Sequence, residues 1–169
     1  SAALDGVYLD AGIALDLDLS ASSKDAAGLI ATLVKARDIS PKDVTIRFGF
    51  GPLGGIAASG ESTVPWKNIA PIFAELISDL ASQGFTGPFA VADGRVVHAA
   101  GGSEAQELAF ALAVAVTYLR AMEAGGMALD DAEEVRRAQL ARQPLPVAER
   151  GQRLGVAAAR ERHHPLRVP

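Results

Sequence analysis

The chain has 169 residues, 49% of them hydrophobic, which is enough for one domain with a sizeable core or a large part of one. It contains no cysteine, which excludes disulfides, thiolate metal sites, iron-sulfur clusters and a cysteine nucleophile. No apolar run reaches the roughly 18 to 20 residues that span a bilayer, and the longest is residues 108–116. We therefore expect no membrane role and, without a visible signal peptide, a cytoplasmic location.

Charge divides the chain near residue 135. Residues 1–135 carry eight basic and eighteen acidic side chains, whereas residues 136–169 carry eight arginines against two glutamates. The predicted boundary separates an acidic domain from an arginine-rich tail that is either helical or poorly ordered. Because the chain starts at Ser1 without a methionine and already has a strand-like pattern at residues 4–10, we expect it to be part of a longer chain.

The first half of the chain alternates predicted strands with a helix. Three segments have the alternating or branched-chain pattern of strands: residues 6–10, 13–19 and 44–48. Between the last two, a helix is predicted from Ser22 or Ser23 to about Arg37, followed by a proline turn at residues 38–43. This order is the beginning of an α/β arrangement.

The second half continues the alternation. A glycine-rich loop at residues 49–60 has room for one or two helical turns but no proper helix, and a helix at residues 68–82 and a strand at 88–92 follow. Strands alternating with helices predict a parallel sheet in an α/β fold. A complete eight-stranded barrel needs roughly 250 residues. The predicted fold is therefore a partial (β/α) barrel or a barrel-derived parallel sheet with flanking helices.

A histidine lies just ahead of the last predicted helix. A short extended segment leads to His98 and a Gly-Gly loop, and Ser103 and Gln106 then have the spacing of a capping box. Every residue from 108 to 116 is apolar, which is typical of a helix buried in a large core or a larger assembly. Gly125-Gly126 can end this helix.

These segments resemble a known family. The residues that carry the resemblance are Val97-His98-Ala-Ala-Gly-Gly-Ser, Glu107-Leu-Ala-Phe-Ala-Leu-Ala, Tyr118-Leu-Arg-Ala, Gly126-Met-Ala-Leu-Asp-Asp, Val44-Thr-Ile-Arg-Phe-Gly-Phe-Gly-Pro-Leu-Gly and Leu4-Asp-Gly-Val-Tyr-Leu-Asp. Residues 1–135 resemble the coenzyme-A-binding barrel domain of adenosylcobalamin-dependent methylmalonyl-CoA mutase, most of all its small, non-catalytic subunit. The resemblance implies a heterodimer with a catalytic large subunit.

The resemblance also shows where this chain departs from catalytic members. In those, a Tyr-His pair stands at this loop, and the histidine donates a hydrogen bond to the thioester carbonyl of the substrate during a radical rearrangement. His98 matches, but Val97 occupies the place of the tyrosine, and Gly49-Phe-Gly51 stands where catalytic members have Gln-Asn-Asp. We interpret His98 as a vestigial catalytic residue or as a loop histidine satisfied by backbone or solvent.

The cobalamin-binding pattern of the family, Asp-x-His-x-x-Gly, is incomplete. His98 and Gly101 match its second half, but Val96 occupies the place of the aspartate. We therefore expect this chain to bind no cofactor, with adenosylcobalamin implied for the family complex. We also expect no metal site, because the other candidate ligands lack the spacing of a binding loop: Asp16, Asp18, Asp130, Asp131, His163 and His164.

Two alternative functions remain open. Gly49, Gly51 and Gly54 satisfy the dinucleotide pattern G-x-G-x-x-G, so the loop at residues 49–60 could belong to a stand-alone acyl-CoA or nucleotide-binding module, although a flexible loop at a strand end is the simpler interpretation. The chain could also be a folded remnant without a function. Our leading hypothesis is a chain that is not catalytically competent alone and that binds the large subunit or self-associates, without nucleic-acid partners.

Overall fold

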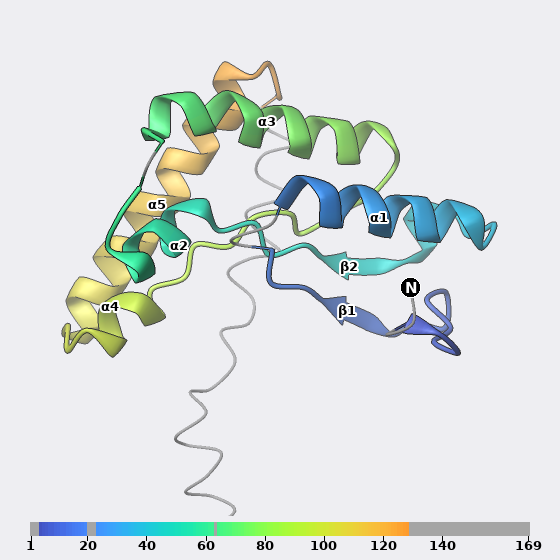
Figure 1. Ribbon diagram of the computed structural model, residues 1–169, viewed down its shortest axis with the longest axis horizontal. Helices are drawn as coiled ribbons and strands as arrows, with labels where there is room; N and C mark the ends of the chain where they lie inside the picture. The colour runs from blue at the N-terminus through green and yellow to red at the C-terminus, as the bar shows by residue number, and fades with distance from the viewer. Residues whose placement is uncertain (1–3, 20–22, 63, 129–169) are drawn as a thin grey trace, which may run out of the picture. The chain divides into compact units, whose positions relative to one another are not determined.

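The computed structural model describes residues 4–19, 23–62 and 64–128 (Figure 1). Within these ranges the elements are β1 Ala14–Asp16, α1 Ser23–Ala36, the short 3-10 helix η2 Pro41–Asp43, β2 Thr45–Arg47, α2 Pro52–Ser59, α3 Trp66–Ser82, α4 Arg95–Ala99 and α5 Glu104–Ala124. The predicted boundary near residue 135 and the tail at residues 136–169 lie outside the described residues.

The sheet is parallel, as the alternation of strands and helices predicts. β1 and β2 pair in the register Ala14–Thr45, Leu15–Ile46 and Asp16–Arg47. Beyond β2 the chain pairs with a third segment, because the Phe50 N–H donates to the Phe89 carbonyl and the Val91 N–H donates to the Phe50 carbonyl, both at 2.9 Å. These bonds flank an isolated parallel bridge between Phe50 and Ala90.

The predicted strands meet different outcomes. Residues 13–19 contain β1 and residues 44–48 contain β2, so both predictions are confirmed at their centres. The strand predicted at residues 88–92 lies beside the end of β2 but pairs through a single bridge instead of a ladder. The strand predicted at residues 6–10 is wrong, because the chain turns there.

The turns near the N-terminus are held by a side chain that directly follows α1. The Arg37 guanidinium, one residue after α1, donates to the carbonyl oxygens of Leu4 and Val7, each at 2.6 Å. Gly6 and Gly12 have φ values of +74° and +76°, which are accessible to glycine at little cost. The carbonyls that a strand ladder would use are therefore bound by a side chain from a distant part of the sequence.

The core lies on one face of the sheet. In Figure 1, α1 and α3 lie on the same side of β1 and β2. Every second residue of the β2 segment is buried toward this side: Val44, Ile46, Phe48 and Phe50. The Phe48 ring stacks on Phe89 with centroids 5.7 Å apart and meets Phe85 edge-on at 5.5 Å. The α/β class is thus confirmed, whereas the described strands form an open sheet and no closed barrel.

The three long helices were predicted well. α1 and α3 occupy the predicted segments, and α5 begins at the capping box that Ser103 and Gln106 predict. The Ser103 hydroxyl accepts from the Gln106 N–H at 3.4 Å, and the Gln106 Oε1 accepts from the Ser103 N–H at 2.8 Å. Because these contacts involve residues three positions apart, sequence alone was enough to place this helix start.

α2 corrects the prediction that the glycine-rich loop at residues 49–60 holds no proper helix. The helix starts at Pro52, whose fixed φ suits a first helical position. It ends at Ser59 and is capped by Gly60, whose φ is +74° and whose N–H donates to the Ile56 carbonyl. Two internal glycines weaken a helix but do not prevent one that begins and ends correctly.

α4 corrects the prediction that His98 follows an extended segment. Val96 and Val97 favour a strand by local propensity, yet both lie in a helical turn. The cause lies in tertiary packing, since the buried Gly94 packs so closely beneath Glu107 of α5 that any side chain there would collide with it. This close contact leads the chain into α4, directly before α5.

α5 is only partly buried within this chain, and its burial in a larger assembly stays a prediction. Its inward face contributes Val114, Tyr118, Ala121 and Met122 to the core. On the outward face, Leu108, Leu112 and Val116 are 61%, 52% and 44% exposed. Among the described helices, α5 alone is long and apolar enough to cross a bilayer by length and composition, a test that helices of soluble cores also pass.

Candidate functional site

The two predicted site segments lie at the same end of the sheet, the end where its parallel strands have their carboxyl termini. Gly49, Gly51 and Gly54 follow β2, and His98 follows the extended segment at residues 88–92. Because β2 and the extended segment at residues 88–92 run parallel, their carboxyl ends lie at the same end of the sheet, where parallel α/β proteins bind ligands. α2 contacts α4 at this end. The structure therefore brings together the two segments that sequence reasoning singled out.

His98 lies at the surface and faces a carboxylate. Its side chain is 64% exposed, and its Nδ1 lies 3.5 Å from the Oε2 of Glu107, in the first turn of α5. A carboxylate accepts a hydrogen bond from a ring N–H, so this contact can orient the imidazole ring. Sequence reasoning missed Glu107, although its place in the same first helical turn as Gln106 was a usable signal.

Two of the three pattern glycines serve internal packing. Gly49 has a φ of +65°, and a methyl group there would collide with the Leu17 carbonyl. A methyl group on Gly51 would lie 3.0 Å from the Cγ1 of Val91. At Gly54, by contrast, no atom from outside the local helix backbone lies within 4 Å of such a group. The close approach that glycine permits is therefore to the protein's own chain, whereas a dinucleotide site needs that space for a pyrophosphate.

The first N–H group of α2 is bound by a tyrosine from α5. The Leu53 N–H donates to the Oη of Tyr118 at 2.9 Å, and Pro52 before it has no N–H to offer. Burial raises the pKa of Tyr118 to about 12, although backbone hydrogen bonds from Leu53 and Gly54 act in the opposite direction. A buried neutral hydroxyl thus occupies the helix end that an anion would need.

An ion pair closes the turn before α4. The Arg95 Nε and Nη2 donate to the Asp93 carboxylate at 2.8 and 2.5 Å, and the Arg95 N–H donates to the Asp93 Oδ1 at 2.9 Å. Burial raises the pKa of Asp93, but the hydrogen bonds and charge of Arg95 outweigh it and hold that pKa below its ordinary value. The Asp-Gly-Arg order, typical of a turn closed by an aspartate side chain, could have predicted this pair.

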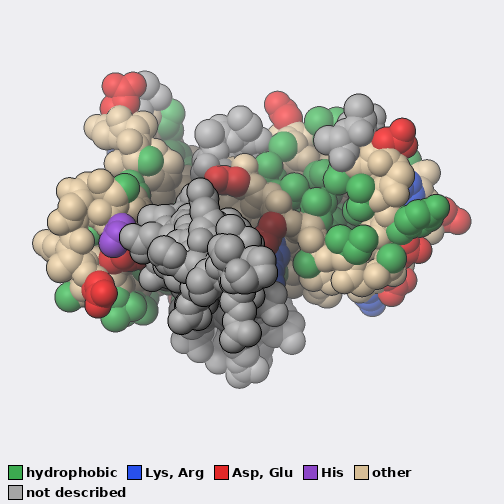
Figure 2. All heavy atoms as spheres, turned by 90° about the horizontal axis from the view of Figure 1, so that it is seen from below, with side chains coloured by type: hydrophobic (Ala, Val, Ile, Leu, Met, Phe, Trp, Pro, Cys, Tyr) green, Lys and Arg blue, Asp and Glu red, His purple; other side chains and the backbone are tan. Residues whose placement is uncertain are grey.

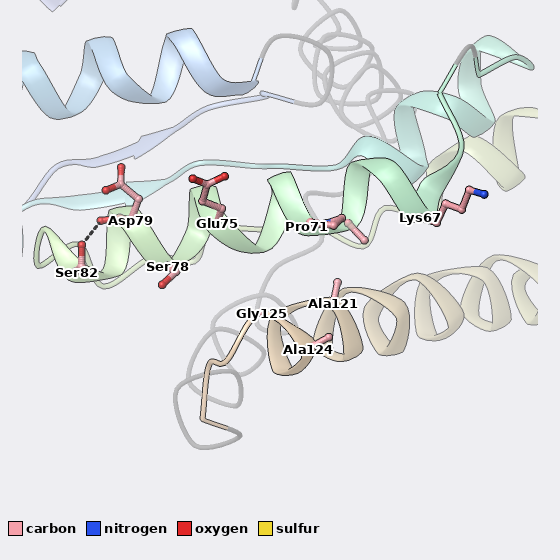
Figure 3. A pocket seen from close by; sticks show the side chains of 10 residues that line it. Lys67, Pro71, Glu75, Ser78, Asp79, Ser82, Ala121, Ala124 and Gly125 are labelled. Atoms are coloured by element: carbon pink, nitrogen blue, oxygen red, sulfur yellow. Dashed lines mark hydrogen bonds between the residues drawn. The ribbon is translucent and has the colours of Figure 1, made fainter.

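A groove of about 550 Å³ lies between α3 and α5, away from both predicted segments (Figure 3). It is lined by Lys67, Ala70, Pro71, Glu75, Ser78, Asp79, Ser82, Ala121, Ala124 and Gly125. Along α5, Glu107 and Ala121 are 14 residues apart, which corresponds to about 21 Å of helix. The groove and the histidine therefore belong to different ends of α5.

The residues around His98 do not fit a cobalamin ligand. In the place of the aspartate that would orient the histidine, Val96 offers only a hydrocarbon side chain. The Nδ1 of His98 faces Glu107 instead, on an exposed helix. Asp16, considered above as a cation ligand, forms an ion pair with Arg47 at 3.3 Å. No three acidic or histidine side chains of the described part of the chain come together as a possible metal site.

Comparison with known proteins agrees with the resemblance. The family model described as methylmalonyl-CoA mutase matches residues 1–136. The methylmalonyl-CoA mutase small subunit of Streptomyces virginiae is 34% identical over 131 residues, which are 77% of this chain and 20% of that protein. The chain thus spans about one fifth of this curated relative, and no solved structure matches it. Because the family match covers most of its length, the chain belongs to the methylmalonyl-CoA mutase family.

Proposed function

We propose that the chain is a non-catalytic, small-subunit-like member of this family that acts as a structural partner of a larger catalytic subunit. The family reaction is the adenosylcobalamin-dependent isomerisation of methylmalonyl-CoA and succinyl-CoA. The relative from Streptomyces virginiae is itself named a small subunit. The observation that carries the proposal concerns the two loops at the carboxyl ends of the strands. They keep His98 but have Val97 and Gly49-Phe-Gly51 in place of the other polar side chains of catalytic members.

These loops keep only part of the polar groups of a substrate site. Val97 stands beside His98 where catalytic relatives have a tyrosine, and Gly49-Phe-Gly51 replaces their amide and carboxylate side chains. A thioester carbonyl that gains negative charge needs a hydrogen-bond donor. The Nδ1 of His98 faces the Glu107 carboxylate of the same chain at 3.5 Å instead.

The edge of β1 supports docking on a larger protein. In the described sheet, β1 pairs with β2 and leaves its other edge unpaired. Tyr8 and Ile13, just before this strand, are 74% and 52% exposed. Figure 2 shows hydrophobic side chains gathered around this end of the molecule, which carries α1 and the loop before β1. Because an unpaired edge beside apolar side chains favours association, we propose it as the contact with the larger subunit.

The test is an activity measurement on the chain alone and on the complex. Mixed with adenosylcobalamin and methylmalonyl-CoA, the chain alone should show no turnover, and after desalting it should retain no visible cobalt spectrum. In the complex with a large mutase subunit, His98→Ala should leave turnover unchanged. Turnover by the chain alone, or loss of turnover in the His98→Ala complex, would contradict a non-catalytic role.

A second candidate is a stand-alone acyl-CoA or nucleotide-binding module. It is favoured by the order of elements, because α2 follows β2 through a Gly49-x-Gly51 turn, as in dinucleotide-binding units. The Tyr118 hydroxyl that binds the Leu53 N–H opposes it. Calorimetric titration with coenzyme A and with NAD separates the two candidates. We expect no tight binding of either ligand, and tight binding of one would favour this second candidate.

A further inference from the structure

The outward face of α5 carries a ridge of large apolar side chains. Leu108, Leu112 and Val116 are spaced four residues apart and are all about half exposed or more. Such residues form a continuous ridge, inclined about 26° to the helix axis. Leu112 is separated around the helix by about 200° from the buried Val114 and by about 120° from the buried Tyr118, so it lies outside the buried face. The ridge therefore faces away from the core.

A row of small residues runs beside this ridge. Ala105, Ala109 and Ala113 are also spaced four residues apart, and all three are exposed. Helices pack when the ridge of one enters the groove of another, and two ridges of this spacing cross at about 50°. The outward face of α5 thus offers a ridge and a matching alanine groove, as a symmetric contact between two copies requires.

The charges at the two ends of the ridge fit the same arrangement. Glu104 lies four residues before Leu108, and Arg120 lies four residues after Val116, and both charged residues are exposed. The row from Glu104 to Arg120 is centred on Leu112. A two-fold axis at Leu112 places Glu104 of one copy nearest Arg120 of the other, whereas a parallel arrangement would bring like charges together.

We propose that α5 is the contact surface of a symmetric, antiparallel dimer of this chain, with Leu112 at the two-fold axis. Such an interface places each Leu-Leu-Val ridge in the alanine groove of the other copy and pairs Glu104 with Arg120 at both ends. One helix pair buries less than the roughly 1,200 Å² of a standard stable interface, so the dimer is weak and depends on concentration. This contact is separate from the β1 edge.

A lipid surface fits this face less well. One side of α5 packs on α3 through Tyr118, whose ring lies 4.6 Å from that of Phe73, so lipid cannot surround the helix. Glu104 and Glu107 lie in its first turn, and Arg120 lies inside it. Placing these charges in lipid hydrocarbon costs free energy. In the proposed dimer, by contrast, Glu104 of one copy lies near Arg120 of the other.

The first experiment measures the mass of the full chain by sedimentation velocity from about 1 µM to about 100 µM, the range in which an interface of this size dissociates. The wild-type mass should rise from monomer to dimer. Leu112→Glu places two carboxylates at the axis and should remain monomeric throughout. A wild-type chain that stays monomeric, or a Leu112→Glu chain that dimerises like wild type, would overturn the proposal.

A charge exchange tests the antiparallel register. Glu104→Arg and Arg120→Glu alone should each weaken the dimer about fivefold or more, because each change acts twice in a symmetric interface. The double variant should restore the wild-type dimer. The two positions are about 24 Å apart along one helix, so a rescue cannot arise within one copy. Failure of the double variant to rescue would overturn the antiparallel pairing.

Controls separate dimer loss from unfolding and from lipid binding. Asp25→Arg makes the same charge change in the first turn of α1 and should leave the dimer unchanged. Far-ultraviolet circular dichroism should show wild-type helix content in every variant. Flotation with phosphatidylcholine vesicles should leave the wild-type chain in the unbound fraction. Co-flotation that Leu112→Glu abolishes would overturn the proposal in favour of a membrane surface.

Discussion

Tyr118 connects three helices through one side chain. It belongs to α5, its ring lies 4.6 Å from that of Phe73 in α3, and its hydroxyl accepts the Leu53 N–H at the start of α2. Tyr118→Phe keeps the ring and removes the acceptor, so a part-buried N–H loses its partner. We expect a loss of about 1 to 2 kcal/mol in the free energy of unfolding. Urea denaturation measures it.

Tyr8→Phe is the matched control for this change. Tyr8 is 74% exposed, and water can replace any partner of its hydroxyl, so the free energy of unfolding should change by less than about 0.5 kcal/mol. Equal losses in the two variants would show that the hydrogen bond to α2 contributes nothing specific.

The raised pKa of Tyr118 predicts a loss of stability at alkaline pH. Its pKa is about 12 in the folded chain and 10.0 as the ordinary value. Between pH 10 and pH 12 the unfolded chain releases this proton while the folded chain retains it. The free energy of unfolding should therefore fall by about 2 to 3 kcal/mol over this window, with the full contribution present below pH 10.

The pH experiment compares two chains. Urea unfolding at pH 9 and at pH 12 should show this fall in the wild type, and Tyr118→Phe should show a fall smaller by the same amount. Other groups that titrate in this window are common to both chains and cancel in the comparison. An identical pH dependence of the two chains would disprove the assignment to Tyr118.

Two glycines of one motif should respond to alanine in opposite ways. Gly49→Ala introduces a methyl group against the Leu17 carbonyl at a φ of +65°, and we expect a loss of more than about 2 kcal/mol. Gly54→Ala adds a methyl group inside α2 that meets no atom within 4 Å beyond the local helix backbone. Alanine is favoured over glycine there by up to about 1 kcal/mol. Thermal unfolding of both variants checks the signs.

The glycine motif at residues 49–54 shows why sequence alone could not identify a ligand site. The pattern of Gly49, Gly51 and Gly54 is the same whether the glycines approach a phosphate or another part of the chain. The distinction depends on Leu17 and Val91, which are 32 and 40 residues away from the glycines they contact. No local pattern contains this information, so the sequence could only leave both interpretations open.

At the scale of single elements, α5 depends on its capping box. Ser103→Ala removes the hydroxyl that accepts the Gln106 N–H and should reduce the free energy of unfolding by about 1 kcal/mol. Ser82→Ala is the control, because the Ser82 hydroxyl donates to the Asp79 carbonyl within the last turn of α3 and does not cap a helix start. Circular dichroism during urea unfolding measures both. A larger loss at Ser82 than at Ser103 would contradict this role.

The helices that were predicted and those that were missed differ in what determines them. α5 starts where Ser103 and Gln106 satisfy each other's backbone, a contact between near neighbours that sequence shows directly. α4 starts where Gly94 packs under Glu107, and the branched side chains of Val96 and Val97 locally favour the opposite structure. Tertiary contacts that override local propensity are therefore the main source of error here.

At the scale of the whole molecule, the described part of the chain is an open α/β layer in which a strand edge and an apolar helix face are exposed. In the described sheet, β1 pairs with β2 on one side and with no strand on the other, and the outward face of α5 is apolar. The sequence predicted the parallel α/β class from the alternation of strands and helices, and it predicted the family, whose model matches residues 1–136. It could not predict which surfaces stay open, because exposure depends on how the elements pack.

The central claim is that this chain is a structural partner of a catalytic mutase subunit. The most direct test is light scattering coupled to size exclusion, on this chain, on the large mutase subunit of the same genome, and on their mixture. We expect the mixture to contain a species with the summed mass, and Ile13→Lys at the β1 edge to weaken it. Separate elution of the two chains at every concentration would contradict the account.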